Sequence, residues 1–253
     1  MIYSFFKKLL YDPLYNALVL VASFMPGADV GLSVIVLTLM VKFAILPLTH
    51  SQMQTQRKMK VVEGEIKEIK KRHSGNSQEQ TKQIMGLYKS HGINPLSGFL
   101  VLLIQIPILL ALYFVFTRGI PFVATDLYSF VSLPAQINFN FLGLIDLAAK
   151  SIPMALLVGV SQYFQVRLAM PPPPKKEKNE TKKEDTPFSF SEELAKSMST
   201  NMRYVMPAMI ALISATLPSV VSLYWLVSNL FSIAHELIVR RKATQIISPT
   251  TTA

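Results

Sequence analysis

The feature that most constrains this chain is a set of long runs without charged residues. Only Lys42 interrupts residues 30–48, and residues 96–117 and 204–234 contain no Asp, Glu, Lys or Arg. A helix at the surface of a soluble protein needs a polar face toward water, so a soluble fold of 253 residues cannot accommodate so many uncharged runs. Apolar residues make up 51% of the chain and charged residues 16%, against about 25% charged in soluble domains. The sequence therefore predicts an all-α integral membrane protein.

The lengths of the apolar runs predict how often the chain crosses the bilayer. A crossing helix needs about 20 mostly apolar residues. The last apolar tract, residues 204–234, is too long for one crossing, and Pro218 divides it. Because basic residues flank both ends of this tract, we expect it to cross twice. The prediction is five transmembrane helices, over residues 30–48, 96–117, 152–170, 204–217 and 219–239.

The distribution of Lys and Arg predicts the orientation. Nineteen of these residues lie in segments 50–95, 171–203 and 240–253, whereas four lie in the segments on the opposite side. Cytoplasmic loops of membrane proteins carry the excess of basic residues. We therefore expect the N-terminus outside and the C-terminus inside. The expected loops are an extracytoplasmic one over 118–151, a disordered cytoplasmic linker over 171–203, and a cytoplasmic tail over 240–253.

The N-terminal residues 1–25 combine Lys7 and Lys8 with a short apolar run. This pattern imitates a cleaved signal peptide, but no small-residue cleavage site follows it. The run between Pro13 and Pro26 has twelve residues, a helix of about 18 Å, which is too short to cross. We expect an amphipathic helix at the outer membrane surface, with a cleaved signal peptide as the alternative.

The first cytoplasmic segment, residues 51–91, is predicted to form a hairpin of two helices. Apolar residues recur at helical spacing along residues 59–69, and the sequence HSGNS at 73–77 separates them from a second helical pattern. The basic surface of this hairpin is either simply solvated or docks anionic lipid, a ribosome or a partner protein. Its cations are Arg57, Lys58, Lys60, Lys67, Lys70, Lys71 and Arg72.

Lys42 is the one formal charge well inside a predicted span. A lysine at the centre of a membrane helix costs about 2.5–3.5 kcal/mol on insertion scales, so its position needs an explanation. Either its ammonium reaches the inner interface, about 9 Å away, or it faces a hydrated cavity within the bundle. Polar residues on the other spans favour a cavity. The candidate lining residues are Thr38, Lys42, Gln105, Gln162, Ser222, Trp225, Asn229 and Ser232.

Four segments of the chain resemble the bacterial YidC-type membrane protein insertase family. They are residues 37–49 (LTLMVKFAILPLT), 87–96 (LYKSHGINPL), 103–108 (LIQIPI) and 223–232 (LYWLVSNLFS). The resemblance implies a multi-pass protein of the bacterial inner membrane that inserts nascent membrane proteins without being an enzyme. It also aligns Lys42 with a groove cation that is usually arginine in the family. Lysine keeps the charge but lacks the planar guanidinium group.

The resemblance further implies a hydrophilic, positively charged groove, open to the cytoplasm and to lipid. The partners it implies are nascent membrane proteins and the bilayer, with the Sec translocon and the ribosome as further candidates. We expect no cofactor, no metal and no direct reading of nucleic acid, because the chain has no cysteine and no glycine-rich phosphate loop. Two other functions stay open: a small transporter or channel, and a membrane anchor that recruits a cytoplasmic partner.

Overall fold

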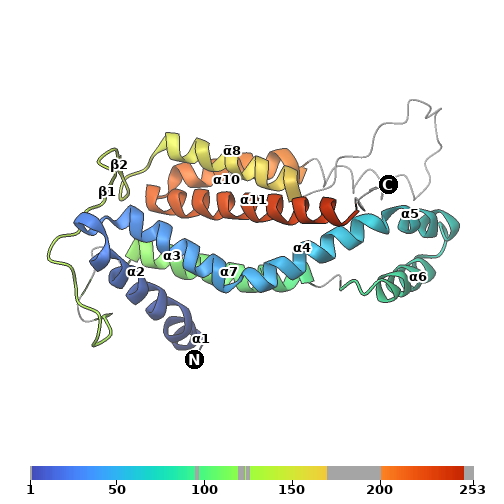
Figure 1. Ribbon diagram of the computed structural model, residues 1–253, viewed down its shortest axis with the longest axis horizontal. Helices are drawn as coiled ribbons and strands as arrows, with labels where there is room; N and C mark the ends of the chain where they lie inside the picture. Colours follow the sequence, from blue (N-terminus) through green and yellow to red (C-terminus); the bar gives the residue numbers. More distant parts are fainter. Residues whose placement is uncertain (1, 95–96, 119–122, 124–125, 170–200, 248–253) are drawn as a thin grey trace, which may run out of the picture.

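The computed structural model describes the chain except residues 1, 95–96, 119–122, 124–125, 170–200 and 248–253 (Figure 1). Helices dominate the described residues, which confirms the predicted helical class. Residues 171–200 of the expected linker and residues 248–253 of the expected tail lie outside the described residues. In chain order the helices are α1 (Ile2–Phe6), η1 (Lys7–Tyr11), α2 (Asp12–Phe24), η2 (Pro26–Ala28), α3 (Val30–Ala44), α4 (Leu46–Val61), α5 (Glu63–Arg72), α6 (Ser77–Ser90), α7 (Ser97–Arg118), α8 (Ile152–Ala169), η4 (Asn201–Val205), α10 (Met206–Thr216) and α11 (Ser219–Ile247).

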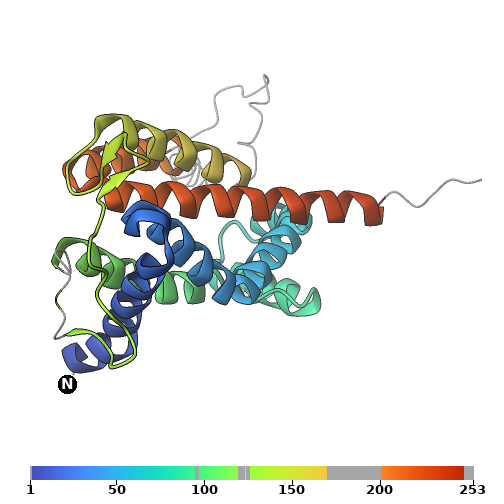
Figure 2. The same ribbon diagram turned by 60° about the vertical axis from the view of Figure 1, so that its left-hand side comes forward.

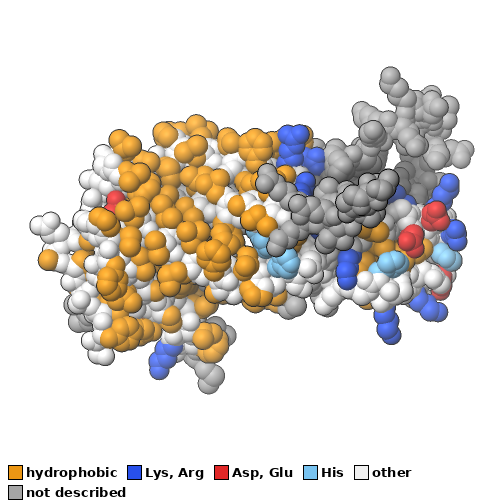
Figure 3. Space-filling view, viewed as in Figure 1, with side chains coloured by type: hydrophobic (Ala, Val, Ile, Leu, Met, Phe, Trp, Pro, Cys, Tyr) orange, Lys and Arg blue, Asp and Glu red, His pale blue; other side chains and the backbone are white. Residues whose placement is uncertain are grey.

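The long helices form a bundle in two groups. Figures 1 and 2 show α8, α10 and α11 on one side and α3 and α7 on the other, with α11 packed against both α8 and α3. Hydrophobic side chains cover much of the bundle surface, whereas most charged side chains gather toward α4, α5 and α6 (Figure 3). This distribution is typical of a bundle surrounded by lipid with one end in water.

One end of the bundle, opposite to α5 and α6, is closed by a short loop structure, and we name it the capped end. Two two-residue strands, β1 (Asn140–Phe141) and β2 (Ile145–Asp146), pair there in antiparallel fashion. The backbone N–H of Val220 donates to the carbonyl oxygen of Leu147 at 3.0 Å, which ties the start of α11 to this loop. Gly31 is required beneath it, because a Cβ atom at this position would lie 2.2 Å from the Phe141 ring. The sequence did not predict these strands.

The other end, which we name the hairpin end, begins where α3 turns into α4. The two helices differ in direction by 61°, and Ile45 at the junction has non-helical torsions. Pro47 lies in the first turn of α4, where its missing N–H costs no hydrogen bond. The helix expected over residues 30–48 is therefore bent after Ala44, and α4 carries the chain to Val61.

The hairpin itself consists of α5 and α6, which pack against each other. The side chain of Asn76 caps α6 by accepting a hydrogen bond from the N–H of Glu79 at 3.1 Å. This cap falls within the HSGNS segment, where the sequence predicts the turn.

By length and composition, one helix of the described residues can cross a membrane alone, over Ser219–Arg240. The bent pair α3 and α4 meets the same test as a unit, and two shorter apolar helices cover Leu103–Thr117 and Arg203–Thr216. The number of crossings and the sides of the two termini remain predictions.

The N-terminal helices form an almost continuous rod that packs with one face on the bundle. Tyr15, Leu18 and Val19 of α2 are at most 1% exposed, and α2 contacts α3 and α7. Phe5 and Leu9 at the other end of the rod are 67% and 55% exposed. Exposed apolar groups at this position are consistent with the predicted helix at the membrane surface.

Candidate functional site

The site is built around Lys42, in the last turn of α3. Its side chain is only 8% exposed. Among the residues that the structure describes, no hydrogen bond or ion pair engages its ammonium group. The C-terminal turn of a helix favours a cation, since its carbonyl groups point toward it. A buried charge without a protein partner still requires water or a ligand.

Thr38 lies one turn before Lys42 and is 1% exposed. Its hydroxyl donates to the carbonyl oxygen of Val34 at 2.6 Å, so its hydrogen is used within α3. The hydroxyl oxygen keeps a free acceptor position beside the ammonium-bearing turn. Thr38 therefore contributes polarity without requiring a partner from another helix.

Polar side chains from α8 and α11 are buried in the same half of the bundle. Asn229 donates from Nδ2 to Oγ of Ser161 at 3.0 Å, and this hydroxyl donates to the carbonyl oxygen of Val158 at 2.9 Å. Gln162 and Ser228 are each 7% exposed. Ser161 and Ser228 did not feature in the sequence prediction. The sequence does place them directly before two predicted lining residues, Gln162 and Asn229, and this position could have identified them.

An aromatic contact between α3 and α11 lies beside Lys42 and Asn229 in the sequence. The rings of Phe43 and Phe231 meet edge to face, with their centroids 5.2 Å apart. The turn of α3 that carries Lys42 is therefore beside the turn of α11 that carries Asn229 and Ser232. Ser232 is partly exposed, and its hydroxyl donates to the carbonyl oxygen of Ser228 at 2.9 Å.

Three other predicted lining residues lie nearer to the capped end. Ser222 is fully buried, and its hydroxyl is 2.7 Å from that of Ser214, which ties α11 to α10. Gln105 donates to the hydroxyl of Tyr224 at 3.1 Å. Trp225 is partly buried against the hydrophobic core. The predicted polar stripe of α11 is thus divided between two environments.

A charged network joins α4 to the ends of α8 and α11. Glu236 is 8% exposed and accepts a hydrogen bond from Nε of Arg240 at 2.9 Å. Arg57 lies 3.5 Å from the same carboxylate and donates to the carbonyl oxygen of Val239 at 2.7 Å. Lys60 donates to the carbonyl oxygen of Ala169 at 3.4 Å. Burial, followed by the nearby Arg240, lowers the pKa of Lys60.

The predicted basic residues of the hairpin therefore fall into two groups. Arg57 and Lys60 hold α4 against the bundle. The others are exposed, and two of them pair with carboxylates one turn away at 3.0 and 3.1 Å. This exposed group is Lys58, Lys67, Lys70, Lys71 and Arg72.

Two histidines add a further contact between α4 and α11. Nδ1 of His50 lies 3.2 Å from Nε2 of His235, and Nε2 of His50 lies 3.0 Å from the amide nitrogen of Gln54. The ring centroids are 5.5 Å apart and the ring planes differ by 25°. The centroid separation exceeds the nitrogen separation by about two ring radii, so the two nitrogens face each other along one line. This geometry is that of a shared N–H···N hydrogen bond. Within the described residues, no three His, Cys, Asp or Glu side chains gather as metal ligands would.

Comparison with known proteins shows which family the chain belongs to. Residues 21–246 match the family described as "60Kd inner membrane protein". The chain belongs to this family. A relative from Alkalihalophilus pseudofirmus, named a membrane protein insertase YidC, is 30% identical over 228 residues, which cover 87% of this chain and 76% of that protein.

Other relatives in the family carry similar names and differ in length. The insertase YidC of Fusobacterium nucleatum is 29% identical over 84% of this chain and 86% of its own length. The insertase MisCA of Bacillus subtilis is 27% identical over 93% of this chain and 79% of its own length. The similarity to the YidC of Wolinella succinogenes covers only 33% of that longer protein.

Proposed function

We propose that this protein is a membrane protein insertase that moves nascent transmembrane segments from the cytoplasm into the bilayer. The route is a hydrophilic groove at the hairpin end, centred on Lys42. The observation that carries the proposal is a buried ammonium without a described protein partner, in a half of the bundle that also buries Gln162 and Asn229. The relatives' names support the same activity.

In the proposed topology the chain crosses the inner membrane five times, with the N-terminus outside and the C-terminus inside. The hairpin end then faces the cytoplasm and the capped end faces outward. The exposed basic residues of the hairpin support this orientation, because cytoplasmic segments carry the excess of Lys and Arg. They also offer a docking surface for the ribosome or the Sec translocon.

The groove acts on the polar part of the substrate. Each unsatisfied polar group in hydrocarbon costs several kcal/mol, so a hydrophilic segment crosses slowly through lipid alone. Thr38, Gln162, Asn229 and water would solvate this segment part of the way. Lys42 would attract its acidic residues, because opposite charges interact strongly where water is partly excluded.

The apolar part of the substrate leaves sideways into lipid. Transfer of apolar surface out of water supplies the free energy, at about 25 cal/mol per Å². The short apolar helix over Arg203–Thr216 reaches only about 21 Å and would thin the bilayer beside the groove. In this scheme no covalent bond is made or broken and no cofactor takes part, so the protein is not an enzyme.

Site-specific photo-crosslinking to a stalled nascent membrane protein tests the proposal. The photoreactive residue is placed at positions 38, 42, 105 and 229 in separate variants. A matched control carries it at Leu144, which is 85% exposed in the loop of the capped end. We expect labelling of the nascent chain from positions 42 and 229 and none from 144. Equal labelling from all positions, or labelling from 144 alone, would contradict the groove.

A further inference from the structure

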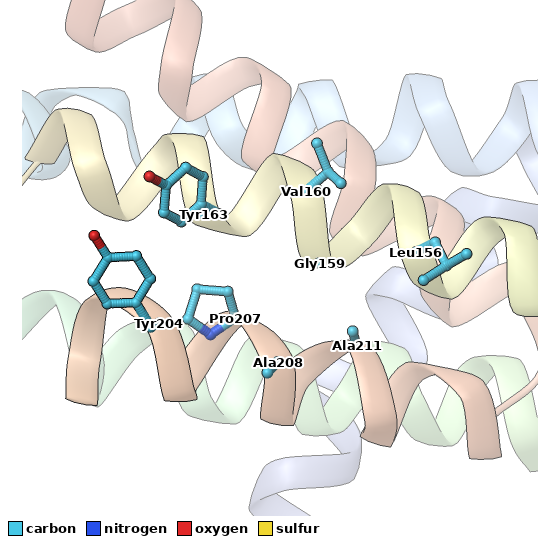
Figure 4. A pocket seen from close by; sticks show the side chains of 8 residues that line it. All are labelled: Leu156, Gly159, Val160, Tyr163, Tyr204, Pro207, Ala208 and Ala211. Atoms are coloured by element: carbon cyan, nitrogen blue, oxygen red, sulfur yellow. The ribbon is translucent and has the colours of Figure 1, made fainter. Parts of the chain in front are cut away.

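A separate open crevice lies on the surface between α8 and α10, with a volume of about 300 Å³. Figure 4 shows its lining side chains on the two helices. Leu156 and Val160, which line it from α8, are 62% and 55% exposed, so the crevice opens toward the surroundings of the bundle. The full lining is Leu156, Gly159, Val160, Tyr163, Tyr204, Pro207, Ala208 and Ala211.

The crevice has a closed floor because α8 and α10 approach closely. A Cβ atom added at Gly159 would lie 2.8 Å from the Cβ atom of Ala211, so the helices touch there and a larger residue would separate them. Ala208 has a short side chain, so α10 projects little over the channel along the same stretch (Figure 4). The result is a shallow apolar channel along the bundle surface.

The two ends of the channel differ in chemistry. The rings of Tyr163 and Tyr204 lie 5.9 Å apart at the end nearer to the hairpin end of the bundle (Figure 4). Leu156, Val160, Tyr163 and Arg167 recur at helical spacing, which places the exposed Arg167 one turn beyond the tyrosines on the same face. Lys60 and Arg240 bind the last carbonyl oxygens of α8. Neither of these two residues lines the channel, which is apolar along its body and has one exposed cation, Arg167, beyond its end.

We propose that this channel binds one acyl chain of an anionic phospholipid from the leaflet at the hairpin end. The chain lies along Leu156 and Val160, and its phosphate group lies near Arg167 and the two tyrosine hydroxyls. The distance along α8 from Leu156 to Arg167 is about 16 Å, close to the thickness of one hydrocarbon leaflet, about 15 Å. The positive end argues for a negatively charged headgroup.

The shape of the channel favours a lipid over a helix. A helix with its side chains is about 10 Å wide, whereas α8 and α10 touch at Gly159 and Ala211, so a third helix would rest on the rim of the channel and not lie in it. A single hydrocarbon chain is narrow enough to lie between the α8 and α10 walls. This inference is independent of Lys42 and of the proposed groove, because it concerns a lipid-facing surface on the α8–α10 side of the bundle.

The test uses the full chain in nanodiscs that contain a photoactivatable phosphatidylglycerol, without any substrate. Val160→Trp fills the channel, and the fold accommodates a larger side chain there because Val160 is 55% exposed. Leu157→Trp is the matched control, because Leu157 is 50% exposed on α8 but does not line the channel. Mass spectrometry of the labelled peptides gives the yield at α8 and α10.

We expect Val160→Trp to reduce labelling of α8 and α10 about tenfold and Leu157→Trp to leave it unchanged. Arg167→Gln should reduce the preference for phosphatidylglycerol over phosphatidylcholine about fivefold, because one basic residue near an anionic surface contributes about 1 kcal/mol. Equal labelling of both lipids in wild type and Arg167→Gln would overturn the proposal. Unchanged labelling of Val160→Trp would overturn it as well. Since lipid labelling needs no insertion, its failure is distinguishable from failure of the proposed function.

Discussion

Over its first eight residues α3 buries Val30, Val34 and Leu37 together with the small Ser33, whereas over its last seven residues it buries Thr38 and Lys42. Helix α11 changes in the same direction, from Val220 and Leu223 to residues such as Asn229 and Glu236. Both helices thus belong to an apolar core at the capped end and to a polar interior at the hairpin end. The comparison teaches that buried side chains differ in polarity between the two halves of one bundle, and under the proposed function the polar half would solvate the substrate.

The energetic reasons differ between the halves. At the capped end, Leu112 and Val115 of α7 join the side chains of α2 and α3 in one hydrophobic cluster. Close packing makes such a cluster sensitive to the loss of a few methyl groups. At the hairpin end, the hydroxyls of Thr38 and Ser232 bind carbonyl oxygens of their own helices, and Asn229 binds one neighbouring helix. Each of these hydrogen bonds contributes only about 1 kcal/mol to stability, so replacing one of them by a hydrogen bond to water or substrate costs little free energy.

The largest expected effect is on stability, from truncation at the capped end. Leu112 is 1% exposed, and Leu112→Ala should lower the free energy of unfolding by about 2–5 kcal/mol, because it leaves a cavity in the core. Leu110, on the same helix, is 46% exposed and provides the matched control as Leu110→Ala. Thermal unfolding of the two variants in one detergent measures the difference. Equal melting temperatures would mean that the capped half does not hold the bundle together.

The next effect concerns the charge at the hairpin end. Lys42→Glu should slow insertion of a substrate with an acidic N-terminal segment by about ten- to a hundredfold, since attraction becomes repulsion in a partly dehydrated site. Lys42→Arg should retain insertion, and Lys150→Glu is the control, because Lys150 is exposed in the loop of the capped end. Insertion into proteoliposomes, scored by protease protection, gives the rates. Undiminished insertion by Lys42→Glu and Lys42→Ala would contradict a role for Lys42 in the groove. The lysine would then simply extend its ammonium group toward the inner membrane interface.

The sequence predicted the helices well because long uncharged runs admit few other structures. It also placed Thr38, Lys42, Gln162 and Asn229 at membrane depth, and the structure buries all four. Whether they line a groove for substrate remains a prediction. Sequence spacing alone could not divide the polar stripe of α11, because the partner of Ser222 is Ser214 on another helix.

Two further features depended on tertiary structure. Arg57 and Lys60 are indistinguishable from Lys67 in the sequence, but the 61° bend before α4 brings only the first two against α8 and α11. The strands at the capped end contain two residues each, which is too short for an alternating pattern to be visible. Both features arise from contacts between segments far apart in the chain.

A smaller effect should separate stability from function within the polar half. Asn229→Leu removes the hydrogen bond to Ser161, whose hydroxyl still donates to the carbonyl oxygen of Val158. The free energy of unfolding should therefore change by no more than about 1 kcal/mol. Insertion of a polar segment should still fall about threefold, because the groove loses a group that solvates it.

The control for this variant lies in the other half. Ser222→Ala removes a buried hydroxyl pair with Ser214, so it should lower stability by about 1 kcal/mol and leave insertion by the folded protein unchanged. The same thermal and insertion assays apply to both variants. If Ser222→Ala slowed insertion as much as Asn229→Leu, the division between the halves would be wrong.

The smallest expected effect is a response to acid at the contact between His50 and His235. Their facing nitrogens share one hydrogen, so a second hydrogen between them would set two N–H groups against each other. The neighbouring carboxylate, Glu236, is already engaged by Arg57 and Arg240 and offers little compensation. A shift from about pH 8 to about pH 5 should therefore lengthen the distance between spin labels at the exposed positions Lys58 and Ile238. In His50→Gln this distance should no longer depend on pH, since an amide does not titrate in this range; a pH response that persists in His50→Gln would assign it to another group at the hairpin end.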